Sequence, residues 1–496
     1  MSPFGFFGRV GLLLGILSGF SAAAGAATVE QLVKDLKPSV VNIEVSIAIG
    51  LGDDSSGASV GTGFVADSQR GLIVTNQHVS GKSPAQYKIT FYNGESTKEV
   101  RLKYYDAWHD FALLQVDTSS LGFALQAVSF GSSLGLQSQD KVFLIGNNEA
   151  QNYTVLYGEV INTDVDEGDR HTGSFQVVYG NRGGSSGSPV FDSEGRVVGL
   201  HYKGTEATGF EIRIEYVRDV LERLVSEEGR PQRGDIGVVL DLMMISDAEK
   251  NYHLPDAIAE EIRSKKKDIK KMVYVERIIS DSPAAGKLEP GDLVLSVDGM
   301  LIGDSLYAFD RQVDAKMGRD VSLRIVRDAK EMRIRLHAGD AEKDKIHRFA
   351  LFGGAVLHDW TPMLQYKYNT TSEGVCMIQA EPGSSLSGVG NADKDAPKQR
   401  RVVIEAIDGH PTPNLETFIQ EAAKLKNGDD IYLTIRDLSA YNTSAKTVPV
   451  TLDLKYFPLK VFEFSEKQLD WSEIKQGEYQ GHRHKNHRTQ KDTVSL

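Results

Sequence analysis

The sequence has little cysteine, no excess of positive charge and few long apolar runs, and each of these excludes a class of protein. A single cysteine among 496 residues excludes an internal disulfide. Lys and Arg number 56 against 68 Asp and Glu, and the net charge of −12 would repel a phosphate backbone, which argues against a nucleic-acid partner. After residue 27 no apolar run approaches the length that spans a bilayer. The lone Cys376 lies in the run GVCMIQA, which predicts a buried strand rather than a reactive thiol.

The N-terminus has the features of a secretory signal. Arg9 precedes an apolar run over residues 10–20, and the small residues of SAAAGAAT then offer cleavage sites after Ala24 or Ala26. An uncleaved membrane anchor is the alternative, because the weakly polar stretch that follows brings the segment near the lower limit for spanning a bilayer. We therefore expect a periplasmic or secreted protein, with membrane anchoring left open.

The segment after the signal consists of short β-runs that are punctuated by Gly, Asn, Asp and Ser. These runs occupy residues 39–49, 61–67, 71–79, 87–93, 110–116, 141–147 and 196–202. Such spacing is typical of a β-barrel or sandwich rather than of βαβ units. The first clear helical pattern begins at Ile214 and stops at Gly229, which places the end of the first domain near residue 230.

The stretch GGSSGSPVFD, residues 183–192, holds a candidate nucleophile in one of two registers. With Ser185 at its centre it matches the G-x-S-x-G elbow of α/β-hydrolases, but that elbow needs a following helix, and PVFDSEGRVVGL predicts a β-hairpin instead. Shifted by one residue, it resembles the G-[DN]-S-G-G-P motif of chymotrypsin-like proteases, with Ser186 as the nucleophile. That register requires a histidine and then an aspartate upstream, each at the end of a β-run.

Both residues are present in the required order. His78 ends the run IVTNQHV and Asp110 opens DFALLQV. A serine hydroxyl becomes a good nucleophile when an imidazole accepts its proton, and a buried carboxylate holds that imidazole in the correct tautomer. The predicted catalytic residues are therefore His78, Asp110 and Ser186. The amides of Gly184 and Ser186 would form the oxyanion hole, in which each donor is typically worth about 3 kcal/mol.

Four blocks resemble HtrA (DegP-type) serine proteases and together cover residues 29–228 almost continuously. They are GTGFVADSQRGLIVTNQHV, DFALLQV, GGSSGSPVFDSEGRVVGL and GFEIRIEYVRDVLERL. The resemblance implies a double β-barrel with the site between the barrels, ATP independence and cleavage of unfolded proteins. Ser185 and Ser188 depart from the usual motif and resemble the GGSSGSP variant of the long, duplicated HtrA-type proteases of fungi and plants, of which this chain looks like one half. Residues 162–173 are a candidate sensor loop.

The second half of the chain contains a repeat. LVLSVDG ends at Gly299 and VIEAIDG ends at Gly409. The first copy resembles a PDZ domain, which binds an extended peptide as an added strand and captures its terminal carboxylate with backbone amides. The predicted peptide-binding residues, given in chain order, are Arg233, Gly234, Ile236 and Gly237. In the second copy only FGGAVLHDW, residues 352–360, resembles such a loop, and a docking or regulatory role is equally expected there.

The expected architecture is mainly β, with a chymotrypsin-like double β-barrel protease domain followed by two α+β PDZ domains. The expected segments are a signal peptide at 1–27, the protease at 28–230, PDZ domains at 231–342 and 343–458, and a partly disordered extension at 459–496. We expect an ATP-independent serine endopeptidase of the cell envelope that forms a homo-oligomer, a trimer or a multiple of one, like its relatives. Its partners would be unfolded proteins and peptides with a free C-terminal carboxylate. A non-proteolytic holdase or peptide-binding scaffold is the alternative. No cofactor is assigned, and no metal is assigned to the tail histidines His482, His484 and His487.

Overall fold

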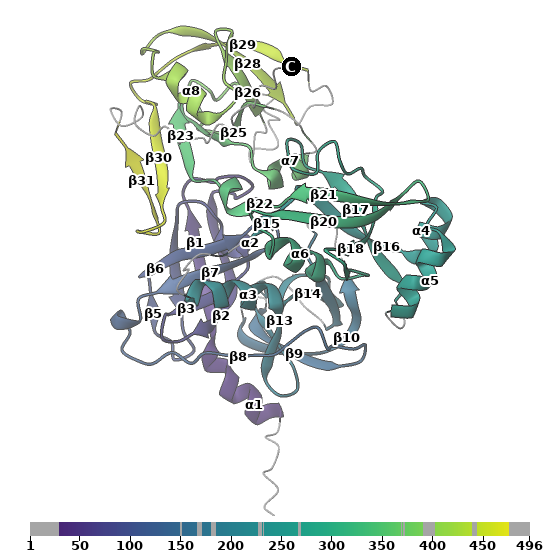
Figure 1. The fold of residues 1–496 in the computed structure, drawn as a ribbon. Helices are drawn as coiled ribbons and strands as arrows, with labels where there is room; N and C mark the ends of the chain where they lie inside the picture. The colour runs from purple at the N-terminus through teal and green to yellow at the C-terminus, as the bar shows by residue number, and fades with distance from the viewer. Residues whose placement is uncertain are drawn as a thin grey trace, which may run out of the picture.

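The computed structural model describes residues 29–148, 151–165, 171–179, 185–226, 231, 233–265, 269–368, 370, 373–389, 402–438 and 444–475. Figure 1 shows a two-barrel domain in purple and blue, a first α+β domain in teal and a second α+β domain in green and yellow. The predicted mainly β fold class is confirmed. No helix among the described residues combines the length and the apolar character needed to cross a membrane.

The first barrel is a seven-stranded sheet in the order β5-β4-β1-β2-β3-β7-β6. Its strands are β1 (Val40–Ile47), β2 (Gly57–Asp67), β3 (Leu72–Thr75), β4 (Ala85–Thr90), β5 (Ser96–Thr97), β6 (Val100–Asp106) and β7 (Phe111–Val116). The one-turn helix α2 (Gln77–Ser80) follows β3, and α1 (Val29–Leu36) precedes the barrel. Apolar side chains alternate along β1 because only one of its faces is buried, which is why its pattern was readable in the sequence.

The second barrel is also built from seven strands, in the order β12-β9-β10-β11-β14-β13-β8, and an additional β12–β13 pairing closes it. Its strands are β8 (Ser129–Phe130), β9 (Lys141–Asn148), β10 (Gln151–Val165), β11 (Ser174–Val178), β12 (Pro189–Phe191), β13 (Arg196–Gly204) and β14 (Thr208–Arg213). Helix α3 (Ile214–Val225) follows, where the sequence predicts it. Phe64 and Phe111 of the first barrel share one apolar cluster with Phe143 and Phe191 of the second, so the two barrels pack as a unit.

The first α+β domain is a sheet in the order β16-β17-β18-β20-β21 with helices beside it. Its elements are β15 (Gly234–Asp235), β16 (Val238–Met244), α4 (Ile245–Asn251), α5 (Asp256–Lys265), β17 (Lys271–Ile278), β18 (Leu293–Val297), β19 (Met300–Leu301), α6 (Leu306–Asp314), β20 (Asp320–Arg327), β21 (Lys330–His337) and β22 (Gly339–Asp340). The side chain of Ser305 accepts the Ala308 amide and caps the start of α6. Strand β16 lies at the edge of the sheet.

The second α+β domain repeats this plan and adds a hairpin. Its elements are β23 (Arg348–Phe352), β24 (Ala355–Asp359), α7 (Pro362–Tyr368), β25 (Val375–Ala380), β26 (Val402–Ile407), β27 (His410–Pro411), α8 (Leu415–Ala422), β28 (Asp430–Asp437), β29 (Lys446–Thr451), β30 (Lys460–Ser465) and β31 (Asp470–Ile474). The repeat appears in the backbone, because Asp298–Gly299 and Asp408–Gly409 form equivalent turns with positive φ at both residues. Cys376 is buried in β25, as predicted.

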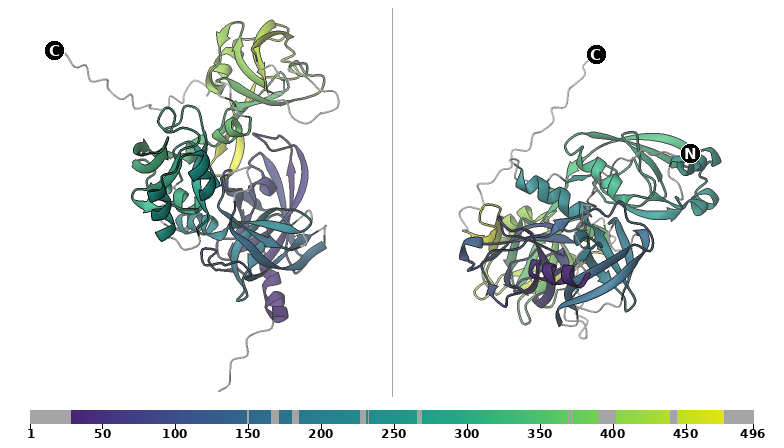
Figure 2. Two further views of the ribbon diagram at one scale, coloured as in Figure 1. Left: turned by 90° about the vertical axis from the view of Figure 1, so that its right-hand side faces the viewer. Right: turned by 90° about the horizontal axis from the view of Figure 1, so that it is seen from below.

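Both α+β domains pack on the two-barrel domain. Helix α6 lies against α3, where the Tyr307 hydroxyl donates to Asp219 at 2.9 Å and the Tyr216 hydroxyl donates to Asp310 at 2.8 Å. The β30–β31 hairpin extends from the second α+β domain down beside the first barrel, and Figure 2 shows α1 on the far side from that domain. The predicted C-terminal extension therefore contributes ordered strands up to residue 474.

Candidate active site

His78 and Asp110 meet at one end of the first barrel. Strands β3 and β7 are antiparallel neighbours, with Thr75 opposite Ala112, so the segment after β3 lies beside the segment before β7. His78 Nδ1 is 2.7 Å from Asp110 Oδ2, and the His78 amide donates to Asp110 Oδ1 at 2.9 Å. The Asp110 side chain is 7% exposed, whereas that of His78 is 40% exposed. The carboxylate therefore fixes one ring nitrogen and leaves the other side of the imidazole accessible.

Asp110 itself is held in an unusual backbone conformation. Its φ is +51°, a region that costs free energy for residues other than glycine. The Asn76 amide group donates to the Asp110 carbonyl at 2.9 Å and supports this conformation. His78 on α2 and Asn76 just before it thus fix the carboxylate of Asp110 and its backbone, respectively.

The loop that carries Ser186 docks on the first barrel beside α2. The Thr62 amide donates to the Ser186 carbonyl at 2.9 Å. A Cβ added to Gly61 would lie 2.5 Å from Val79 Cγ1 and 3.3 Å from the Ser186 carbonyl oxygen, so the glycine is wedged between the serine loop and the neighbour of His78. Gly187 has φ +87°, and a Cβ there would overlap the Thr62 carbonyl, so the close approach requires glycine.

The three predicted catalytic residues are gathered in one region, but the serine is not hydrogen-bonded to the imidazole. Ser186 Oγ donates to the Tyr202 carbonyl at 3.5 Å, and no hydrogen bond joins Ser186 to His78 in the part of the chain that the structure describes. Such catalytic hydrogen bonds are commonly long or broken in unliganded enzymes. Gly184, the second predicted oxyanion donor, lies outside the described residues.

A buried polar cluster beneath the serine loop escaped the sequence analysis. Glu211 and His201 are buried, with His201 Nδ1 3.0 Å from Glu211 Oε1, and the Tyr179 hydroxyl donates to the same carboxylate oxygen. The Gly187 amide donates to the His201 carbonyl, so the cluster supports the strand on which the loop rests. The only signal in the sequence was a glutamate inside the apolar run GFEIRI.

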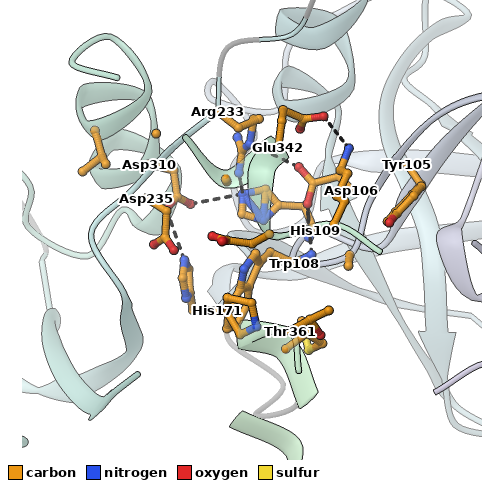
Figure 3. Close-up of a pocket in the computed structure, with 18 of the residues that line it drawn as sticks. Tyr105, Asp106, Trp108, His109, His171, Arg233, Asp235, Asp310, Glu342 and Thr361 are labelled. Carbon is orange, nitrogen blue, oxygen red and sulfur yellow. Dashed lines mark hydrogen bonds and ion pairs between the residues drawn. The ribbon is translucent and has the colours of Figure 1, made fainter. Parts of the chain in front are cut away.

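A pocket between all three domains lies behind the aspartate segment of the site, and Figure 3 shows its charged lining. Arg233 reaches Asp314 Oδ2 at 2.8 Å and Asp106 Oδ2 at 3.3 Å, and it donates to His109 Nε2 at 2.8 Å. Burial raises the pKa of Asp314 to about 7 despite the nearby guanidinium. Burial also lowers the pKa of His109 to about 4, so this ring is neutral beside Arg233. Since Asp106 and His109 lie just before Asp110, this network joins the site to the first α+β domain.

The structure gives the predicted peptide-binding loop different partners from those expected. The Arg233 side chain is 12% exposed and its guanidinium faces two carboxylates, so its contacts make it an interdomain ion-pair residue rather than a free cation for a peptide. The Gly234 amide donates to Asp314 Oδ1 at 2.8 Å and the Gly237 amide to Asp235 Oδ1 at 2.7 Å, and Ile236 is buried. Peptide binding by Gly234, Ile236 and Gly237 stays a prediction.

The candidate sensor loop, residues 162–173, contacts the first α+β domain at both ends. Residues 166–170 lie outside the described residues. At one end, Lys271 Nζ donates to the Asp164 carbonyl at 3.3 Å, and at the other, His171 Nε2 lies 3.3 Å from Asp310 Oδ1. Thr172 Oγ1 donates to the carbonyl of Trp108 at 2.9 Å, two residues before Asp110. The described residues contain no group of three or more His, Cys, Asp or Glu side chains arranged to hold a metal ion.

Comparisons with known proteins agree with this architecture. Family models match a trypsin-like peptidase domain at residues 61–200, a PDZ domain at 259–337 and a PDZ-like domain at 345–428. The chain is 27% identical over 431 residues to the pro-apoptotic serine protease NMA111 of Meyerozyma guilliermondii, covering 85% of this chain and 42% of that protein. The protein of the same name from Phaeosphaeria nodorum is 28% identical over 440 residues, covering 85% and 41%. A solved structure, HtrA-type protease AlgW with tripeptide, is 22% identical with a TM-score of 0.47, covering 62% of this chain and 96% of that one.

The fold and the matches define a trypsin-like peptidase domain joined to two PDZ domains. The predicted resemblance to serine proteases is confirmed for the peptidase domain, and the curated relatives that match most of the chain are named serine proteases. The chain spans about two fifths of the length of the curated relatives that it matches. The two-barrel domain is called the peptidase domain below, and the two α+β domains are called the first and second PDZ domains.

Proposed function

We propose that this chain is an ATP-independent serine endopeptidase of the HtrA type that degrades unfolded or damaged proteins. The observation that carries the proposal is the 2.7 Å contact between His78 and Asp110 beside the docked Ser186 loop. Ser186 Oγ would attack the peptide carbonyl while His78 Nε2 takes its proton and Asp110 keeps the other ring proton on Nδ1. The imidazolium then gives its proton to the leaving amine, and water hydrolyses the acyl-enzyme by the same path in reverse.

The hydroxyl of Ser186 must change its hydrogen-bond partner before this chemistry. The hydroxyl of Ser186 must leave the Tyr202 carbonyl and turn toward His78 Nε2, while the Gly184 and Ser186 amides face the developing oxyanion. The contacts of the loop at residues 162–173 with the first PDZ domain favour a switch in which this loop orders the site. The first PDZ domain would thereby couple recognition of a substrate peptide to the peptidase.

We further propose that the protein acts outside the cytoplasm, in the cell envelope, as a homo-oligomer. The N-terminal apolar segment with small residues at its end supports export.

The first PDZ domain would bind the substrate peptide. Its strand β16 lies at a sheet edge, which is the position at which such domains add an extended peptide with a free carboxylate.

A holdase that rarely assembles its active site is the second candidate function. The observation that favours the holdase is the hydrogen bond from the Ser186 hydroxyl to the Tyr202 carbonyl, which turns the serine to a partner other than His78. The two functions are separated by incubating the wild-type chain and Ser186→Ala with a fluorophosphonate probe and with unfolded casein. A protease labels and degrades in the wild type alone, whereas equal behaviour of both chains, with protection of casein from aggregation, would establish the holdase instead.

A further inference from the structure

The helix that carries His78 cannot hold its own position. Helix α2 has four residues, and the side chain of its N-cap residue, Asn76, makes no capping hydrogen bond. A single turn of helix is unstable in isolation, because nucleation fixes several dihedral angles for one hydrogen bond. The location of His78 therefore depends on tertiary contacts at both ends of α2. Asp110 supplies the contact at one end.

Asp54 supplies the contact at the other end. Its Oδ2 accepts the amides of Lys82 at 2.6 Å and of Ser83 at 3.0 Å, together with the Ser83 hydroxyl at 2.6 Å. Its Oδ1 accepts the side-chain amide of Gln77, the neighbour of His78, at 3.3 Å. The Asp54 side chain is 6% exposed. Charge-assisted hydrogen bonds to a carboxylate that is shielded from water are stronger than hydrogen bonds between neutral groups.

The second PDZ domain contacts the loop that carries Asp54 through three residues just before it, Leu51 to Asp53. The Gly52 amide donates to Nε2 of buried His358 at 2.9 Å, while His358 Nδ1 donates to the Asp359 carbonyl, which fixes the tautomer. Leu51 is fully buried in an apolar cluster with residues of the second PDZ domain, namely Ile346, Phe349 and Val356. Lys367 of α7 reaches Asp53 Oδ2 at 3.3 Å.

The contacts of the second PDZ domain fit a domain that packs on the peptidase domain rather than one that binds a peptide at a free strand edge. Its strand β24 is paired on both sides, by β23 and β25, so it offers no free edge. In its candidate cradle, residues 352–360, the Gly353 amide already donates to the carbonyl of Phe457 at 3.1 Å. By contrast, β16 in the first PDZ domain lies at a sheet edge. The sequence left peptide binding and docking open for this domain, and these contacts favour docking.

We propose that Asp54 is a positioning residue for His78, and that the second PDZ domain sets the catalytic helix by holding Asp54 through His358 and Leu51. This inference rests on the proposed peptidase function. The contact path runs from His358 through Gly52 to Asp54, and from Asp54 to the residues on both sides of His78 in sequence. In this arrangement the second PDZ domain acts on catalysis without binding substrate.

The test compares Asp54→Asn with Asp67→Asn in the full-length chain. Asp67 is a matched control, because it also accepts two backbone amides in a tight turn of the same barrel, those of Gln69 and Arg70. Reaction with a fluorophosphonate probe yields an amplitude, which counts folded and competent sites, and a rate constant, which reports how well His78 is placed. We expect Asp54→Asn to lower the rate constant about tenfold or more at full amplitude, since small misplacements cost up to about 100-fold. Asp67→Asn should stay within about twofold.

A second variant keeps the test decisive if Asp54→Asn does not fold. His358→Ala lies in the other domain, and it should also slow labelling at full amplitude, with a combined effect in the double variant smaller than the product of the two. Wild-type rate constants in His358→Ala and in the competent fraction of Asp54→Asn would overturn the inference while leaving the peptidase intact. A wild-type chain that does not react with the probe would overturn the proposed function, and this inference with it.

Discussion

Replacing Arg233 with methionine should loosen the junction between the peptidase domain and the first PDZ domain. Methionine keeps much of the apolar stem but removes the guanidinium, which pairs with Asp314 at 2.8 Å and Asp106 at 3.3 Å. Both carboxylates are buried and would be left without this cation. Removing one partner of a buried ion pair typically costs about 3–5 kcal/mol, because the remaining charge stays desolvated.

The cost of this substitution should grow with pH. Burial raises the pKa of Asp314 to about 7 in the folded chain, well above the ordinary value for an aspartate. An acid whose pKa is raised by folding is best tolerated in its protonated form, so its contribution to stability is lost as the pH rises through 7. Without Arg233 that pKa rises further. The loss in Arg233→Met should therefore be near 3 kcal/mol or less at pH 6 and approach the upper end of the range at pH 8.

Urea unfolding at pH 6 and pH 8 measures this loss in the free energy of unfolding, which is obtained from the midpoint and slope of each transition. Arg311→Met is the matched control, because Arg311 also bridges the two domains through Asp219 but its side chain is 52% exposed. An exposed pair of this kind should contribute less than about 1 kcal/mol. The reasoning is refuted if Arg233→Met unfolds within 1 kcal/mol of the wild type at pH 8, or if it matches the control.

Three further substitutions probe the site and its support. Asp110→Asn should lower kcat about 10⁴-fold on an unfolded protein substrate, because the imidazole loses its tautomer; a loss under tenfold would contradict this. Gly187→Ala should abolish fluorophosphonate labelling, because its Cβ overlaps the Thr62 carbonyl, whereas Gly94→Ala, with a similar φ of +86° and open space around it, should label normally. His358→Gln should be less stable than the wild type at neutral pH, and this difference in stability should shrink as the pH falls. Burial lowers the folded pKa of His358 to about 4, so up to about 3 kcal/mol of wild-type stability is present above pH 6.5 and is lost toward pH 4. Melting temperatures at pH 7 and pH 4.5 that differ equally between the two chains would refute the last expectation.

The strands were predictable where one face alone is buried. Strand β1 alternates in the sequence because it alternates between core and surface, and α3 was readable from its apolar spacing. The prediction that residues 71–79 form a single strand was too long, since β3 ends at Thr75 and His78 lies on α2. A four-residue helix is too short to show a helical period, so its sequence looked like a strand end.

The pairing of His78 with Asp110 could be predicted because the order of residue types follows a known chemistry. The structure brings these two together and docks the Ser186 loop nearby, although the serine hydroxyl bonds to Tyr202. No residue pattern encodes which group a serine hydroxyl contacts in the folded chain.

The supporting charges could not be predicted from the sequence. Arg233 and Asp314 are 81 residues apart, and Gly52 and His358 are 306 apart. A charged residue that will be buried in an interdomain contact has the same local pattern as one that stays in water. The sequence neighbours of Arg233 indicate a peptide-binding loop, whereas its buried partners, Asp106 and Asp314, lie in distant segments that no local pattern connects to it.

The central claim is that a hydroxyl, an imidazole and a carboxylate from three segments act as one catalytic unit. Mapping the fluorophosphonate adduct by mass spectrometry in the wild type and in His78→Ala tests this most directly. The account predicts a single adduct on Ser186 that forms at least about 10³-fold more slowly without the imidazole. An adduct on Ser185 or Ser188, or an equal rate of modification of Ser186 in both chains, would contradict it.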